Sequence, residues 1–335
     1  MLHGTSLLRG YSLNAEIFSE WLRRQNYRVL RTDSSYWFEA GQRVLQAFPY
    51  HWIIEPTDTE LSELLRTQTC ISLRYSSAIK STIGCLSYHG VLTRSPYDQT
   101  TLSKKARYDV RQGLKTCHIE QISFDQLAQQ GWKLQADTMD RQERGEAMTF
   151  AAWKRLCLAA QDLPGFEAWG AIIRGQLGAS AIICQIDDWS YILYQQSLRE
   201  YLPTKINNAL AFTLTKEILT RPQISNIHYG LHSLDAPASV DEFKFRMGYS
   251  PKPVRQRVVF HPFLRPLVNR SIHTILQRLN QNIPGHRLLA KAEGMVRFYL
   301  EGFKPIRDQQ WPACLEGIRH RIVTTAKNDR PRTLP

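Results

Sequence analysis

One lysine of this chain stands among aromatic residues, in the stretch DEFKFRMGYS that begins at residue 241. Lys244 lies between Phe243 and Phe245, and Gly248 precedes a strand-like segment. An ammonium that points into a cleft could offset the negative charge of a tetrahedral intermediate or of a donor phosphate. The same lysine could instead pack its stem on the rings and extend its charge into water. The residues leave both interpretations open, and Gly248 fits either because a glycine after the last turn ends a helix.

Two histidines alternate along SNIHYGLHS, residues 225–233, which has the pattern of a strand. His228 and His232 therefore share one face of that strand. Either imidazole could accept the proton of a reacting amine, because the group titrates near neutrality, and a structural role is the alternative. Tyr229 in this segment and Tyr194 in the earlier strand SYILYQQS would line the space between the two strands or pack in the core.

A long amphipathic helix, TKINNALAFTLTKEILTR, is predicted over residues 204–221, between these two strands. Thr204 is the expected N-cap and Lys205 adds positive charge, while Asn207 and Asn208 fall in the first turn. The free N–H groups and the positive dipole end of such a helix make an anion site.

A shorter basic helix is predicted over residues 101–117, with Ser103 as its N-cap. Lys104, Arg107 and Arg111 fall on this helix, and the two arginines share a face because they are four residues apart. They could hold the phosphates of an anionic acceptor or donor. A solvated face with no ligand is the alternative.

The elements that must position these residues alternate in type. From residue 117 the pattern predicts the order β-α-α-β-β-β-α-β-α-β, which indicates a mixed α+β unit with a mostly antiparallel sheet and flanking helices. The first hundred residues read as a less regular α/β unit, with a helix that has Thr57 or Asp58 as its N-cap. We expect an N-terminal domain over residues 1–115, a second domain over 116–262 and a basic helical tail over 263–335.

Charge and composition limit the partners. Lys plus Arg number 43 and Asp plus Glu number 30, so the net charge is +13, which favours anionic partners. The tail after residue 262 carries 13 basic and 5 acidic residues, and its amphipathic helices could dock on the protein itself or on an anionic membrane surface.

Six scattered cysteines without a CxxC pair indicate buried free thiols and no zinc site. No apolar run has the length of a membrane span and the N-terminus lacks a signal-peptide pattern, so we expect a cytoplasmic protein.

Common catalytic motifs are missing from the sequence. It contains no GxGxxG after a strand, no GxxxxGK[ST], no HExxH and no GxSxG. The usual nucleotide-binding, zinc-protease and serine-hydrolase interpretations therefore lack support.

Three stretches in order resemble one family. SKKARYDVRQGLK is similar to a basic helix, YILYQQSLREYLPTKINNALAFTLTKEI to a strand, loop and donor-side helix, and FKFRMGY to a closing motif of the GNAT acyltransferase fold. The resemblance covers roughly residues 101–260. It is to the subgroup with two such domains in tandem: the Fem-type family of peptidoglycan-bridge aminoacyltransferases and the related BioF2-like acetyltransferases. The first hundred residues would then be a degenerate first GNAT-like domain.

The resemblance implies where a donor would bind. In the GNAT fold two neighbouring strands splay apart, and their unpaired backbone groups hold the arm of the acyl donor. Here the strands would be SYILYQQS and SNIHYGLHS. The resemblance also implies a catalytic role for the lysine of FKFRMGY, and we add His228 as the expected proton acceptor. The donor-binding set is Tyr194, Gln195, Ser197, Thr204, Lys205, Asn207, Asn208 and Tyr229, and the acceptor or phosphate set is Lys104, Arg107 and Arg111.

Two departures from the family pattern affect the donor and the base. The loop before residue 204 lacks the RxxGxG/A pyrophosphate signature of acetyl-CoA enzymes, and His228 stands where relatives often carry Asp. We expect an N-acyltransferase that uses acyl-CoA, such as acetyl-CoA, or aminoacyl-tRNA as co-substrate, with no permanently bound cofactor and no metal. The acceptor would be an amine of an amino sugar or peptide in cell-envelope or polysaccharide synthesis, and DNA is not an expected partner. The alternative is an inactive GNAT-like module that binds an anionic glycan, lipid or RNA.

Overall fold

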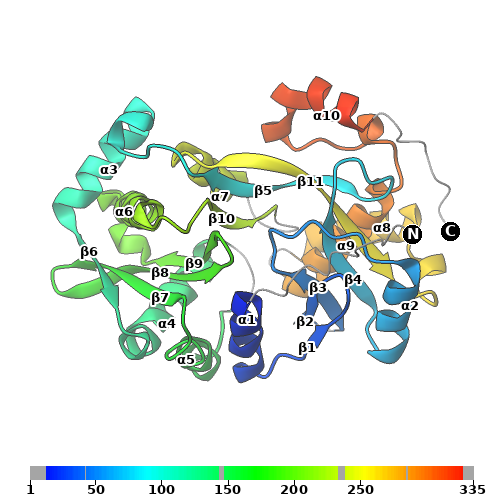
Figure 1. Ribbon diagram of the computed structural model, residues 1–335, viewed down its shortest axis with the longest axis horizontal. Helices are drawn as coiled ribbons and strands as arrows, with labels where there is room; N and C mark the ends of the chain where they lie inside the picture. Colours follow the sequence, from blue (N-terminus) through cyan, green and yellow to red (C-terminus); the bar gives the residue numbers. More distant parts are fainter. Residues whose placement is uncertain (1–12, 42, 143–146, 233–237, 284–285, 327–335) are drawn as a thin grey trace, which may run out of the picture.

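The computed structural model describes residues 13–41, 43–142, 147–232, 238–283 and 286–326 (Figure 1). The first part of the chain supplies five strands and three helices. The strands are β1 (Val29–Arg31), β2 (Tyr36–Gly41), β3 (Val44–Phe48), β4 (Ser72–Ser77) and β5 (Cys85–Thr93). The helices are α1 (Leu13–Arg24), α2 (Asp58–Thr67) and α3 (Lys104–Thr116). The predicted caps of α2 and α3 are confirmed, because the Thr57 side chain accepts from Glu60 N–H and the Ser103 side chain accepts from Ala106 N–H.

The second part follows the predicted order of elements. Its strands are β6 (His118–Ile122), β7 (Phe166–Ile173), β8 (Gln176–Ile186), β9 (Trp189–Ser197), β10 (Asn226–Leu231) and β11 (Ser250–Phe260). Its helices are α4 (Phe124–Arg141), α5 (Phe150–Leu158), α6 (Ile206–Thr220) and α7 (Ala238–Arg246). The turn between β7 and β8 has positive φ angles at Arg174 and Gly175, 50° and 76°, which suit a tight hairpin.

One continuous sheet joins the two parts. Its strand order is β1-β2-β3-β4-β11-β5-β10-β9-β8-β7-β6. Neighbouring strands run antiparallel except in the pairs β3–β4 and β9–β10, which are parallel. The predicted α+β class with a mostly antiparallel sheet is therefore confirmed.

The two central strands cross between the parts. β5 comes from the first part and pairs with β10, while β11 comes from the second part and pairs with β4. β5 and β11 also pair with each other, and Figure 1 shows them running side by side through the middle of the molecule. The boundaries at residues 115 and 262 stay predictions, since the sheet is continuous across them.

The helices cover both faces of the sheet. The predicted stripe of α6, which is Ile206, Leu210, Leu214 and Ile218, is fully buried against the sheet and against α3. On the opposite face α1, α4 and α5 enclose a second core with Phe18, Trp153 and Tyr191. All six cysteines are free, and only Cys314 is partly exposed, as the sequence predicts for unpaired thiols.

The tail adds three helices: α8 (Arg270–Asn282), α9 (Arg287–Glu301) and α10 (Arg319–Thr325). α9 packs on β11, and α8 packs on α9. No helix in the described ranges is long and apolar enough to cross a bilayer.

Candidate active site

The parallel pair β9–β10 opens into a V. The register holds for three residue pairs and ends at His228 and Tyr191. Beyond that point β9 continues beside β8, and Leu231 of β10 pairs with His89 of β5. A register shift against β8 leaves Leu193 as an extra residue in β9, and such a bulge bends a strand away from its neighbour. The expected splay of these two strands is therefore present.

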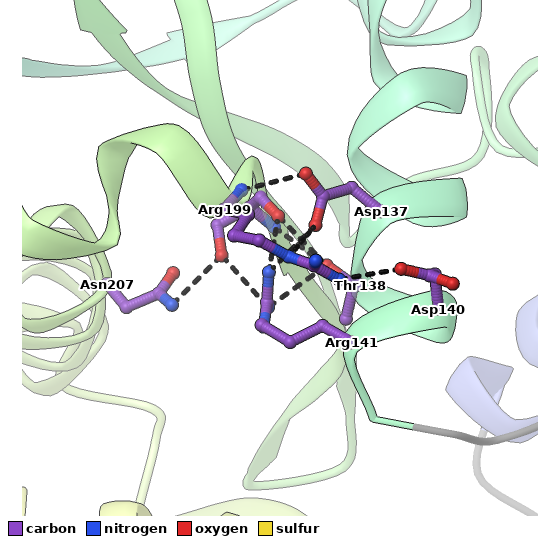
Figure 2. Close-up of polar contacts among 7 residues, drawn as sticks. Asp137, Thr138, Asp140, Arg141, Arg199 and Asn207 are labelled. Atoms are coloured by element: carbon purple, nitrogen blue, oxygen red, sulfur yellow. Dashed lines mark hydrogen bonds and ion pairs between the residues drawn. The ribbon is translucent and has the colours of Figure 1, made fainter.

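The end of β9 is fixed by α4. The Thr138 hydroxyl accepts from the Ser197 N–H at 3.0 Å and donates to the Ser197 carbonyl at 3.1 Å. Arg141 donates to the same carbonyl at 3.2 Å, and Asn207 of α6 donates to the Ser197 hydroxyl at 3.0 Å. Figure 2 shows Asn207 approaching from one side and Thr138 and Arg141 from the other. Ser197 is fully buried and joins β9, α4 and α6. We expected it to face a donor, and its side chain instead bonds to these elements.

The loop after β9 is held by two further carboxylates of α4. Asp137 accepts from the Arg199 backbone N–H at 2.8 Å, and Asp140 accepts from its guanidinium at 2.6 Å (Figure 2). The chain then forms a short 3-10 helix over Arg199–Thr204 before α6 begins. These contacts set the position at which the N-terminus of α6 meets the open end of the V.

The N-terminus of α6 has no side-chain cap. Its N-cap is Lys205 with a left-handed φ of 65°, so the prediction of Thr204 as cap is wrong. The Thr204 hydroxyl donates instead to the Tyr201 carbonyl at 2.7 Å. α3 presses close to this turn, because a Cβ at Gly113 would lie 2.5 Å from the Lys205 carbonyl oxygen. The Asn208 N–H donates to the Lys205 carbonyl at 3.0 Å. No side chain caps this helix end, so the N–H groups before Asn208 could bind an anion.

A cavity of about 240 Å³ lies at this helix end. It is lined by Lys105, Asp109, Leu202, Lys205, Asn207, Asn208, Phe243 and Arg246. Three of these side chains are cationic and one is acidic, with Lys205 Nζ 3.8 Å from Asp109. The Asn207 side-chain oxygen is buried without a hydrogen-bond partner among the described residues. The cavity therefore combines positive charge, helix N–H groups and a free acceptor.

Lys244 projects from α7 toward β10 and β5. Its Nζ lies 2.7 Å from Asp241 Oδ1 and 5.5 Å from the centre of the Tyr229 ring. Glycines make room for the side chain, since a Cβ at Gly230 would lie 3.4 Å from Nζ and one at Gly90 would lie 3.7 Å from Cδ. The lysine is mostly buried and paired with a carboxylate, which is not the geometry of an ammonium that extends into water.

Tyr229 and Gln195 span the V on the α6 side. The Tyr229 hydroxyl donates to Gln195 Oε1, and Gln195 Nε2 donates to the Asn207 carbonyl at 3.5 Å. Burial raises the pKa of Tyr229, so its hydroxyl keeps its proton at neutral pH. Asn208 makes a long contact of 3.7 Å with the sulfur of Met247. Both Gln195 and Tyr229 would have to exchange these bonds for donor contacts.

His228 lies on the other face of β10. Its Nδ1 accepts the Gly230 N–H at 3.2 Å, so the neutral ring carries its proton on Nε2. Burial and then the neighbouring His89 lower the pKa of His228 well below the usual value. Nε2 has no hydrogen-bond partner in the described part of the chain. This geometry makes His228 a hydrogen-bond donor and argues against the expected role as proton acceptor.

A buried aromatic and histidine cluster surrounds His228. His51 stacks on Trp189 with ring centres 4.6 Å apart, and its Nδ1 contacts the Tyr191 hydroxyl. Tyr194 packs against the same core. His232 stacks on Tyr88 at 4.6 Å, away from this cluster.

The basic helix α3 faces partly away from the cavity. Arg107 donates to the carbonyls of Gln99, Thr100 and Leu102, and Arg111 donates to the Gln99 side chain. Lys104 is exposed. None of these three predicted residues lines the cavity, whereas Lys105 does. These three residues therefore lie outside the cavity, and their role with a phosphate stays a prediction.

Sequence reasoning missed several residues of the site. Asp241 could have been found, because it lies three residues before Lys244 on the same helix. Tyr88, which donates to Asp241 Oδ2 at 2.6 Å, comes from a strand of the first part and has no local signal. Arg246 and the α4 contacts to Ser197 also depend on tertiary packing.

The architecture matches solved structures. A structure of FemX aligns at a TM-score of 0.51 and 9% identity, over 80% of this chain and 93% of that chain. The C-terminal domain of a putative lysylphosphatidylglycerol synthetase from Agrobacterium fabrum aligns at 0.50 and 8% identity, over 75% and 89%. A tandem GNAT protein from the clavulanic acid biosynthesis pathway aligns at 0.43 and 11%, over 69% and 81%. No family model and no curated protein matches the sequence.

The chain has a Fem-type, tandem GNAT-like fold. The two halves of the sheet fit the expected pair of GNAT-like units, whose boundaries at residues 115 and 262 stay predictions. Within this fold, the V between β9 and β10 and the uncapped end of α6 lie where the resemblance expects a donor.

Proposed function

We propose that this chain is an N-acyltransferase that moves an acyl or aminoacyl group from acyl-CoA, or from aminoacyl-tRNA, to an amine. The observation that carries the proposal is the cationic cavity at the uncapped N-terminus of α6, at the open end of the V. Helix N–H groups with Lys105, Lys205 and Arg246 would hold donor phosphates. The Asn207 side-chain oxygen would accept an amide N–H of the donor arm.

In the proposed reaction the acceptor amine attacks the carbonyl carbon of the donor. The carbonyl π electrons move to oxygen, and collapse of the tetrahedral intermediate expels the thiolate of CoA or the tRNA hydroxyl oxygen. The leaving group finally carries the proton that the amine loses. Lys244 would stabilise the negative oxygen, with Asp241 and Tyr88 fixing its position.

The acceptor we propose is an amine of an amino sugar or a peptide used in cell-envelope or polysaccharide synthesis. This part is supported only by the likeness of the fold to FemX and to the lysylphosphatidylglycerol synthetase domain. The positive charge of the chain suits the anionic groups that CoA, tRNA and nucleotide sugars share.

Thermal unfolding with CoA, acetyl-CoA or uncharged tRNA, combined with mass spectrometry of ligands retained on the purified protein, tests the proposal. A donor should raise the unfolding temperature of the wild type and not of Lys205→Ala. The matched control Lys80→Ala, which removes a cation lining a cavity near α2, should respond like the wild type. A response to nucleic acid alone that weakens steeply with salt, unaffected by Lys205→Ala, would indicate a binding module instead.

A further inference from the structure

Exposed apolar side chains gather in one segment of the described chain. In the described ranges twelve large hydrophobic residues are exposed, and seven of them lie between residues 263 and 288. These seven, which we call the tail patch, are Phe263, Leu267, Ile272, Ile275, Leu279, Ile283 and Leu288. Single exposed apolar residues are ordinary, but a concentration of this kind marks an interaction surface.

The helix α8 shows how the patch is presented. One narrow side of α8 holds it to the protein: Leu276 packs on the core beneath β11, and His273 Nε2 lies 2.8 Å from Glu293 of α9. Ile272, Ile275 and Leu279 follow at spacings of three and four residues, so they form a separate stripe along the helix. Ile275 is 50% exposed and Leu279 is 41% exposed. The tail therefore docks on the protein and still leaves an apolar stripe uncovered.

The charges beside the patch have one sign. Between residues 263 and 288 the sequence has four arginines and no acidic residue. Arg270 and Arg278 are exposed on α8 itself. A second copy of this face would bring arginines against arginines, whereas anionic headgroups would complement them. Apolar side chains flanked by cations are the pattern of a helix that lies in a membrane interface.

We propose that α8 and its flanking residues bind the surface of an anionic lipid bilayer. Ile272, Ile275 and Leu279 enter the boundary between headgroups and acyl chains, and Arg270 and Arg278 contact headgroup phosphates. The binding is peripheral and weakens with salt, because part of it is electrostatic. This inference does not depend on the transfer chemistry, so either can fail without the other.

The test is flotation of the full-length protein with vesicles of phosphatidylcholine alone or with about one third phosphatidylglycerol. Wild-type protein is expected to float only with the anionic vesicles. The double substitution Ile275→Ser with Leu279→Ser, and separately Arg270→Glu with Arg278→Glu, should each weaken binding by about tenfold or more. All four side chains are exposed, so both variants should keep the wild-type unfolding temperature.

Matched controls lie on α5, at another exposed surface. Phe150→Ser removes an exposed ring, and Lys154→Glu with Arg155→Glu makes the same change of charge. These variants should float like the wild type. Absence of flotation by the wild type, or equal loss in the α5 variants, would overturn the proposal. So would a dimer in solution that Ile275→Ser with Leu279→Ser dissociates, because the patch would then be covered by a second copy.

Discussion

The two GNAT-like units contain the same strand–helix–strand motif, but the N-termini of the two helices differ. In the first unit the strands β3 and β4 run parallel, stay in register for three residue pairs and are connected through α2. In the second unit β9 and β10 do the same and are connected through α6. The N-terminus of α2 is capped by Thr57 and has Asp58 and Glu60 in its first turn. The N-terminus of α6 has neither a side-chain cap nor an acid in its first turn.

The space between the two parallel strands is closed in the first unit and open in the second. In the first unit the segment after β3 closes onto β4, because Ile54 N–H donates to the Ser76 carbonyl at 3.0 Å. In the second unit the V is bridged by the side chains of Gln195 and Tyr229, which can rotate. Acids at a helix N-terminus stabilise the helix and repel an anion, whereas cations near a free end attract one. The difference favours the N-terminus of α6, and not that of α2, as the place where the proposed donor would bind.

The largest expected effect is on the chemical step. Only the second unit follows its second parallel strand with a helix, α7, and Lys244 lies on that helix. Lys244→Met should lower kcat by roughly a hundredfold to a thousandfold and leave the KM for the donor nearly unchanged, because the proposed role of the lysine is in the transition state. Lys244→Met combined with Asp241→Asn controls for the carboxylate left without its partner. Wild-type kcat in both variants would remove Lys244 from the mechanism.

Charge reversal compares the two helix ends directly. Lys205→Glu with Arg246→Glu should weaken donor binding by roughly a hundredfold or more, since each cation makes charge-assisted bonds. Lys80→Glu with Arg257→Glu, at the cavity of about 460 Å³ beside the N-terminus of α2, should leave donor affinity unchanged. Titration calorimetry measures both. A similar loss in the two variants would mean that the helix ends are not different in function.

The face where the two units meet should respond to pH. Burial lowers the pKa of His51 to about 4, and His51 joins the segment after β3 to Trp189 of the second unit. The unfolded chain binds this proton below its ordinary pKa near 6.5 and the folded chain does not, so stability falls as the pH drops from 6.5 toward 4. His51→Gln should remove about 2 kcal/mol of the decrease in unfolding free energy between pH 7 and pH 5. Urea titrations measure the unfolding free energy at each pH. An equal decrease between pH 7 and pH 5 in the variant and the wild type would contradict this prediction.

The smallest effects concern the two N-caps. Thr57→Ala should destabilise the protein by about 1 kcal/mol, because it frees a helix N–H at α2. Lys205→Gly should stabilise it by about 0.5–1 kcal/mol, since glycine adopts the left-handed φ without strain, and should weaken donor binding. Denaturant unfolding of both variants checks the pair of signs. Destabilisation by Lys205→Gly would show that the lysine side chain stabilises the N-terminus of α6.

Local patterns predicted much of this architecture. The order of elements from β6 to β11, the caps Thr57 and Ser103, and the splay of β9 from β10 follow from alternation, helical spacing and the family resemblance. The exchange of β5 and β11 could not be predicted, because it pairs residues some 160 to 170 positions apart, such as Ser250 with Val91 and Arg255 with Leu86.

The candidate site was predicted only in part, because local patterns reveal some of its residues and tertiary packing determines the others. Lys205 and Asn207 line the cavity, because their place in the first turn fixes their direction. Thr204 failed as a cap because a 3-10 helix precedes α6. Ser197 was expected at a donor, but it forms hydrogen bonds with Thr138, Arg141 and Asn207. No local pattern reveals these contacts.

Hydrogen exchange with saturating donor tests the central claim most directly. With acetyl-CoA or an aminoacyl-tRNA present, the backbone amides of residues 192–197 and of the first turn of α6 should exchange more slowly, while those of the first turn of α2 should not change. Slower exchange at α2, or no change at α6 with either donor at concentrations that allow transfer, would contradict the account.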